Sequence, residues 1–383
     1  MLALFRIPVA VTIVGIVAAA ILGGPSVAGV VAILAVLEVS LSFDNAVVNA
    51  TVLQKMDVYW QRIFLTVGVL IAVFGMRLIF PLLVVTIAGH ISPVHALNLA
   101  LHHPHEYAIK LTQAHPAIGA FGGIFLLMIF LDFLFEDQEI SWLGPIERQL
   151  TKVGKLDQAS AIVALVFLII SATTYASKDA VQVLVSGTAG LATYLAVSSL
   201  STLFEADEEE VTDRLQPAGG HGSPAGDDAV GEAAGETAGA AGVPRARIPS
   251  KLARAGLFTF LYLEVLDASF SFDGVVGAFA ITDMIFVIAL GLGIGACYIR
   301  ALTVYLVRKG TLTEYVYLEH GAHWAIGALA ILLFVTIRHN VPELVTGLIG
   351  VAFIGAALIS SIVRNRRAAP AQEISAIPQP LGT

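Results

Sequence analysis

Ten long apolar runs constrain this sequence more than any other feature. They cover residues 7–22, 27–53, 63–89, 116–135, 158–175, 180–203, 254–280, 284–307, 323–339 and 341–363. Each is close to or above the ~20 residues that a helix needs to cross a bilayer. Only 13% of the 383 residues are charged, about half the share found in soluble domains. We therefore predict an all-α, polytopic membrane protein with about ten transmembrane helices.

The distribution of Lys and Arg predicts the orientation of these spans. Sixteen of the 21 Lys and Arg residues fall on one side of the membrane, whereas Lys110, Lys178 and Arg338 fall on the other. Arg77 and Arg300 lie inside spans. Because Lys and Arg concentrate in cytoplasmic loops, we expect a multi-pass protein of the cell (inner or plasma) membrane with both termini in the cytoplasm.

One segment is unlike the rest of the chain. It opens with EADEEE and continues as a Gly/Ala/Pro-rich tract that cannot bury a core. The predicted organisation is a first membrane repeat (1–177), the first helix of a second repeat (178–203), a disordered acidic cytoplasmic linker (204–250), the remainder of the second repeat (251–363) and a disordered cytoplasmic tail (364–383). The single cysteine, Cys297, excludes an internal disulfide or a CxxC site.

The apolar runs contain an internal repeat of polar residues. EVSLSFDNAVVN at 38–49 is echoed by EVLDASFSFDGVV at 264–276. The alignment pairs Glu38 with Asp267, Ser40 with Ser269, Ser42 with Ser271, Asp44 with Asp273 and, further on, Arg77 with Arg300. The two copies are five spans apart and would cross the membrane in opposite directions. This pattern indicates inverted-topology repeats, whose binding site lies at the repeat interface near the membrane midplane.

The acids in these copies are expensive inside a membrane. Each costs about 2.5–3.5 kcal/mol at a helix centre, so Glu38, Asp44, Asp267 and Asp273, with Glu264 nearby, must face the protein interior, a cation or water. Carboxylate, hydroxyl and amide oxygens suit hard divalent ions such as Mn2+, Mg2+ or Ca2+. The alternative is that the acids pair with Arg77 and Arg300 and lock the bundle. Sodium or proton coupling is also compatible with these acids.

Helical geometry separates the polar residues of each copy. At about 100° per residue, one stripe holds Glu38, Ser42, Asn45 and Asn49, and a nearly opposite stripe holds Ser40, Asp44 and Thr51. One ideal helix cannot direct both acids at one ion. Either the helices are broken near Phe43–Asn45 and Phe272–Gly274, or they are central and polar on both sides.

Six of the ten histidines lie between the third and fourth runs: His90, His95, His102, His103, His105 and His115. We favour a solvated outer loop there. A metal or pH site at His102, His103 and His105 is the alternative. HGAH at 320–323 is a second weak candidate.

Both copies resemble known signatures. EVSLSFDNAVV is similar to the first signature of the TerC family, a branch of the LysE-type transporter superfamily, and LEVLDASFSFDGVVGAFAIT resembles the second. FGGIFLLMIFLDFLFED and GLGIGACYIRALTVYLV extend the resemblance, although Gly274 and Val276 depart from the family's Ser and Pro. The resemblance implies transport of metal ions, chiefly Mn2+ efflux, and an association with tellurium resistance. It also implies that the ion ligands are Glu38, Asp44, Asn45, Asp267 and Asp273.

The leading hypothesis is a divalent-cation transporter and not an enzyme. The surrounding residues Ser42, Asn49, Glu264, Ser271, Arg77 and Arg300 are expected to support or gate the site. The expected partners are the metal-ion substrate and the lipid bilayer, without nucleic acid or a resident cofactor, and the linker could recruit a cytoplasmic partner. The alternatives are an intramembrane aspartyl-type hydrolase using Asp44 and Asp273, or a membrane scaffold of a metal or tellurium stress-response complex.

Overall fold

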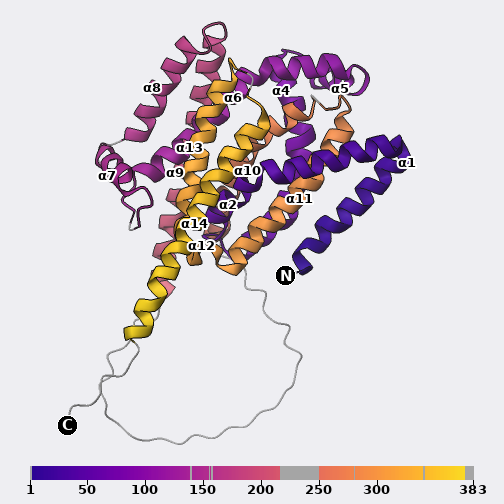
Figure 1. Cartoon of the computed structure of the whole chain (residues 1–383). Coiled ribbons are helices and arrows are strands. Elements are labelled where there is room, and N and C mark those ends of the chain that lie inside the picture. The colour runs from indigo at the N-terminus through magenta and orange to yellow at the C-terminus, as the bar shows by residue number, and fades with distance from the viewer. Residues whose placement is uncertain are drawn as a thin grey trace, which may run out of the picture.

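The computed structural model describes residues 2–138, 140–154, 156, 158–215, 250–279, 281–339 and 341–375, and all regular structure within these ranges is helical. The elements are α1 (Leu2–Leu41), α2 (Phe43–Leu53), α3 (Val58–Ile63), the π-helical segments η1 (Phe64–Gly68) and η2 (Ile71–Ile79), α4 (Phe80–Ala88), α5 (Pro93–His102), α6 (Pro104–Phe135), α7 (Gly144–Val153), α8 (Ala159–Thr174), α9 (Ala180–Leu215), α10 (Ser250–Ala278), α11 (Ile285–Lys309), α12 (Thr311–Glu314), α13 (Leu318–Thr336) and α14 (Glu343–Ser375) (Figure 1).

The predicted apolar runs all fall on helical segments. By length and composition, six described helices could cross a bilayer, or seven if the bent pair Val58–Gly68 and Ile71–Ile87 forms one span. Another, α8, is apolar but has only 16 residues. The chain is thus an all-helical protein with several apolar helices, as a multi-pass membrane protein requires. The count of ten and the inverted repeat stay predictions.

The helix α1 has two arms that meet at a sharp corner (Figure 1). Gly24 makes this corner with a φ of 83°, a conformation that side chains disfavour and glycine adopts readily. The second arm packs on α11 along Gly291 and Gly295. A Cβ at either glycine would strike Leu34 or Glu38 of α1. The glycines therefore let the two backbones approach closely and hold Glu38 against α11.

The helix α10 lies at the centre of the bundle. It contacts α9 and α6 most extensively and also η2, α2 and α11, which come from both halves of the chain. The larger apolar core runs through the same helices and continues into α13. Side chains on opposite faces of α10 are consequently buried, including polar ones such as Glu264 and Ser269.

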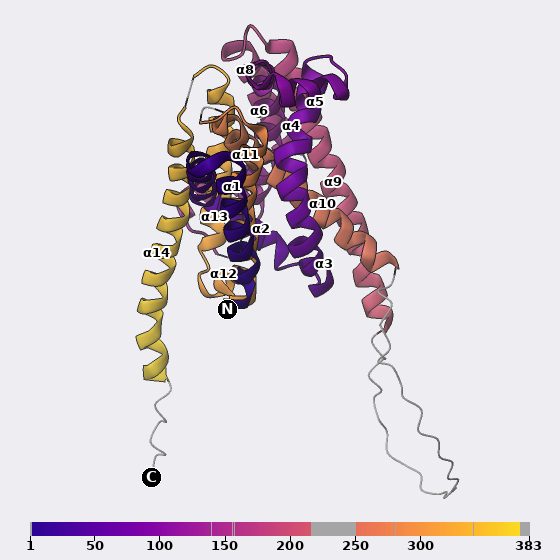
Figure 2. The same cartoon turned by 90° about the vertical axis from the view of Figure 1, so that its right-hand side faces the viewer.

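Helix continues past two of the predicted boundaries. α9 extends to Leu215, through the acidic start of the predicted linker, and α14 extends to Ser375, into the predicted tail. The rest of the linker (216–249) and of the tail (376–383) lies outside the described residues. Charged residues are compatible with a solvated helix, so the loss of apolar character did not mark where helix ends. Figure 2 shows the N-terminus, α3 and the C-terminal half of α14 at one end of the bundle.

Candidate cation site

The first polar copy spans a break between two helices. α1 ends at Leu41, α2 begins at Phe43, and Ser42 between them has φ −99° and ψ 17°. The interruption falls one residue before the range we expected. It places Asp44 in the first turn of α2, where its Oδ1 accepts a hydrogen bond from the Asn45 backbone N–H at 3.0 Å. A carboxylate is favoured there because unpaired N–H groups give the helix N-terminus a partial positive charge.

The second copy has no such break. α10 is continuous from Ser250 to Ala278, so the first of the two alternatives, an interruption at Phe272–Gly274, does not occur. The alternative expectation, a central helix that is polar on both sides, fits instead. Glu264, Asp267, Ser269 and Ser271 are all buried, because neighbouring helices cover several faces of α10.

A cavity of about 50 Å³ lies beside the break. This space can hold a small number of waters or an ion. Its lining comes from both copies and from α13 and α14, and consists of Glu38, Leu41, Ser42, Asp44, Asn45, Phe270, Ser271, Gly274, Leu329, Thr346 and Gly347. The backbone of α14 also approaches closely, because a Cβ at Gly350 would lie in contact with the Asp44 carboxylate. The two copies thus meet at one small cavity whose lining combines apolar side chains with carboxylate, amide and hydroxyl groups.

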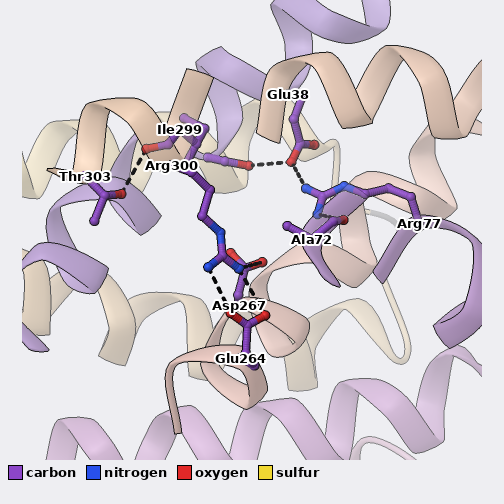
Figure 3. Close-up of polar contacts among 9 residues, drawn as sticks. Glu38, Ala72, Arg77, Glu264, Asp267, Ile299, Arg300 and Thr303 are labelled. Carbon is purple, nitrogen blue, oxygen red and sulfur yellow. Dashed lines mark hydrogen bonds and ion pairs between the residues drawn. The ribbon is translucent and has the colours of Figure 1, made fainter. Parts of the chain in front are cut away.

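Arg77 neutralises the first glutamate of the site. Its Nη2 pairs with Glu38 Oε1, and its Nη1 donates to the Ala72 carbonyl at 2.6 Å (Figure 3). Ser42 Oγ donates to the same Glu38 Oε1 at 3.3 Å. The other Glu38 oxygen, Oε2, lies near Gly274 of α10, at 3.2 Å from the place of a Cβ. Glu38 therefore joins the arginine to the wall of the cavity.

Arg300 occupies the equivalent position in the second copy and binds two acids. Its guanidinium donates to both Glu264 oxygens at 2.9 and 3.1 Å and to Asp267 Oδ2 at 3.1 Å (Figure 3). Its Cζ lies 4.0 Å from the centroid of the Phe64 ring. Charge-assisted, bidentate contacts of this kind are strong and directional, and the aromatic face adds a cation–π contact.

The described acids of this centre outnumber its cations. The formal charge of the centre is −2, because it holds two cations, Arg77 and Arg300, and four acids, Glu38, Asp44, Glu264 and Asp267. Among the described residues, no Lys, Arg or His lies within ion-pair distance of Asp44, although only 7% of Asp44 is exposed. A buried carboxylate without a partner is unstable unless it binds a cation or a proton.

The structure divides the predicted ligands. Glu38, Asp44 and Asn45 line the cavity, whereas Asp267 turns to Arg300. Asp273 lies on α10, but its side chain is outside the described part of the structure. Among the residues described, no three His, Cys, Asp or Glu side chains gather as a metal cage. The sequence analysis did not identify Gly274, Thr346 and Gly347 as residues that line the cavity. No motif marks Thr346 and Gly347, because they lie in a long apolar run.

The supporting residues are also distributed unequally. Ser42 and Ser271 line the cavity, and Arg77, Arg300 and Glu264 form the ion pairs. Asn49 lies one helical turn beyond Asn45 and is fully buried.

The histidines lie elsewhere. His102, His103 and His105 are exposed around the junction of α5 and α6, and among the described side chains they form no metal cluster. His323 stacks on Phe133 at 3.7 Å between ring centroids, and buried His320 lies 4.0 Å from Glu147 of α7. The HGAH motif thus packs the start of α13 against α6 and brings His320 near Glu147 of α7.

The fold and this centre define an all-helical membrane protein with buried acid–arginine clusters around a small polar cavity. Over residues 43–368, most of its length, the chain matches the family described as Protein of unknown function (DUF475), and it belongs to that family. No curated protein and no solved structure matches the chain.

Proposed function

We propose that the protein is a membrane transporter for divalent metal cations, and that it exports Mn2+ by alternating access. The observation that carries this proposal is Asp44. It is a buried carboxylate without a described cationic partner, on the wall of a polar cavity at a broken helix. Intramembrane acids of this kind mark ion pathways.

The donor chemistry supports a hard divalent ion. The cavity offers carboxylate, amide and hydroxyl oxygens from Glu38, Asp44, Asn45, Ser42 and Ser271, which are ligands typical of Mn2+, Mg2+ or Ca2+. The formal charge of −2 on the described acid–arginine centre matches one such ion. The resemblance to the TerC signatures favours Mn2+ among them and adds the association with tellurium resistance.

The arginines hold the remaining acids in place. Arg77 orients Glu38 toward the cavity, and Arg300 draws Glu264 and Asp267 together. An acid and an arginine from equivalent positions pair within each copy. This shared contact supports the relation between the copies that an inverted repeat requires. Rocking of one repeat against the other would expose the cavity to each side in turn.

Charge and shape support the proposed orientation. Both termini in the cytoplasm and ten spans in the cell membrane account for the Lys and Arg asymmetry. The position of the N-terminus and the C-terminal half of α14 at one end of the bundle (Figure 2) agrees with this orientation.

Transport into vesicles tests the proposal. Inside-out vesicles or proteoliposomes holding the wild-type protein should accumulate 54Mn2+ faster than protein-free vesicles, and Asp44→Asn should reduce uptake to the background. The matched control is Asp283→Asn, which changes an acid outside the helices, between α10 and α11. If a metal panel shows no ion that wild type moves, the transporter proposal is wrong. If Asp44→Asn transports like wild type, the site is wrong.

A further inference from the structure

Two buried polar side chains of the repeat copies have no hydrogen-bond partner among the described residues. They are Ser271, whose Oγ is unpaired, and Asn49, whose Oδ1 and Nδ2 are both unpaired with 0% of the residue exposed. Their buried neighbours behave differently: Ser269 Oγ donates to the Val265 carbonyl at 3.0 Å, and Thr51 Oγ1 donates to the Val48 carbonyl at 2.7 Å. Backbone acceptors therefore satisfy the neighbouring hydroxyls, whereas Ser271 and Asn49 are left available.

One of the two unpaired groups lines the cavity, and the other lies one helical turn beyond it. Ser271 lines the cavity, and Asn45 lines it from α2. Asn49 follows Asn45 by four residues and so lies on the same face of α2, one turn closer to its C-terminal end. That end leads through a short turn into α3, which lies at the same end of the bundle as the N-terminus (Figure 2). Asn45 and Asn49 thus form a polar line on α2 from the cavity toward one end of the molecule.

Neutral oxygen donors suit an ion that must move on. A hydroxyl or a carboxamide can replace part of the water shell of a cation without adding charge, and a conducting site must bind weakly enough to release its ion. A buried amide that has no protein partner is a typical neighbour of ordered water.

We propose that the cavity continues as a water-filled half-path along this face of α2, in which Ser271 and Asn49 are further stations for a hydrated divalent cation. The inference of a water path depends only on the unpaired polar atoms of Ser271 and Asn49. The assignment of the cation rests on the proposed function.

Cysteine accessibility tests the path. Cys297 is the single cysteine of the chain and is buried, so Cys297→Ala provides a thiol-free background whose Mn2+ transport is measured first. Ser271→Cys and Asn49→Cys are the test variants, and Ser269→Cys and Thr51→Cys are their buried, hydrogen-bonded controls. Each is treated with a membrane-impermeant cationic thiosulfonate in vesicles of both orientations. Because only a hydrated thiolate reacts, the test positions should react about tenfold faster than the controls, from the side where α3 lies.

The outcomes separate the path from the proposed function. Equal labelling of test and control cysteines from both sides overturns the path, whatever the transport result. If the test positions react fast and Mn2+ slows them, both the path and the stations are supported. Fast labelling that Mn2+ does not slow, in protein that transports Mn2+, overturns the stations. Fast labelling in protein that moves no metal keeps the water path and rejects the transporter.

Transport kinetics of conservative variants add a readout that folding alone would not change. Ser271→Ala should raise the KM for Mn2+ about tenfold with little change in kcat, as the loss of one ion contact predicts. Ser269→Ala should leave both constants unchanged. An equal KM for the two variants contradicts the station at Ser271.

Discussion

The two acidic copies share their spacing but not their structure. In the first, a break at Ser42 exposes Asp44 to a cavity, and Arg77 pairs with one acid. In the second, α10 is continuous, and Arg300 binds both Glu264 and Asp267. The same motif therefore gives one half in which Asp44 lies outside the ion pair and one half in which a single arginine binds both described acids. A site that must bind and release a cation gains from this division, because one half can change while the other holds the bundle together.

The largest expected effect is the loss of the arginine that serves two acids. Arg300→Gln leaves Glu264 and Asp267 buried without their cation, and losing one partner of a buried pair costs about 3–5 kcal/mol. Arg77→Gln strands only Glu38 and should cost less. The measurement is thermal unfolding in detergent, followed by size-exclusion chromatography, with Arg300→Lys as the conservative control. Equal losses of stability for the two Gln variants would show that the two arginines contribute equally, despite their different numbers of acid partners.

Neutralising one acid in each half should have opposite effects on stability. Asp44→Asn removes a buried charge that has no described cationic partner, so the melting temperature should stay or rise while Mn2+ transport falls by about a hundredfold, the scale of one essential ion contact. Asp267→Asn removes a contact of Arg300 and should lower the melting temperature, because a hydrogen bond to a charged group contributes about 1.5–3 kcal/mol. If Asp44→Asn is the less stable variant, Asp44 has a stabilising partner and is not a free ion ligand.

The close approach of α14 to Asp44 can be tested with two glycines of the same helix. A Cβ at Gly350 would contact the Asp44 carboxylate, whereas one at Gly355 would meet nothing within 4 Å. Gly350→Ala should displace Asp44 and lower transport, with an overpacking cost of about 1–3 kcal/mol. Gly355→Ala should stabilise by up to about 1 kcal/mol, because alanine favours helix. Unchanged transport in Gly350→Ala would show that α14 does not confine the site.

The smallest expected effect compares the serines that the repeat aligns. Ser42 donates a long hydrogen bond to Glu38, and Ser271 has no partner. Ser42→Ala should therefore lose about 0.5–1.5 kcal/mol of stability, and Ser271→Ala should lose none. Chemical denaturation in a fixed detergent can resolve the difference. A larger loss for Ser271→Ala would reveal a bond to water that stabilises the fold.

The sequence predicted the helices better than it predicted the contacts between them. Apolar runs and the cost of buried acids were sufficient to locate α1, α10 and the need for a polar interior. The stripe geometry required either a break or burial on all sides, and each solution occurs once. Nothing in EVLDASFSFDGVV itself predicts that this copy is continuous while the first copy is broken. The continuity of α10 depends on the helices that surround it.

Other features depended on partners far away in the chain. The position of α11 beside α10 determines which acids Arg300 binds. Thr346 lines the cavity only because α14 packs against α2. The extension of α9 through EADEEE to Leu215 had no apolar signal, since a helix with charged residues on its surface does not need one.

The smooth seam between α1 and α11 links mechanical and electrical properties of the molecule. At Gly295 the backbone of α11 rests directly against the Glu38 side chain, and the same side chain carries the ion pair with Arg77. A change in the separation of these two helices therefore moves the Glu38 carboxylate directly, because no side chain of α11 lies between them at this point. At this contact, a displacement of α1 relative to α11 therefore also changes the ion pair between Glu38 and Arg77.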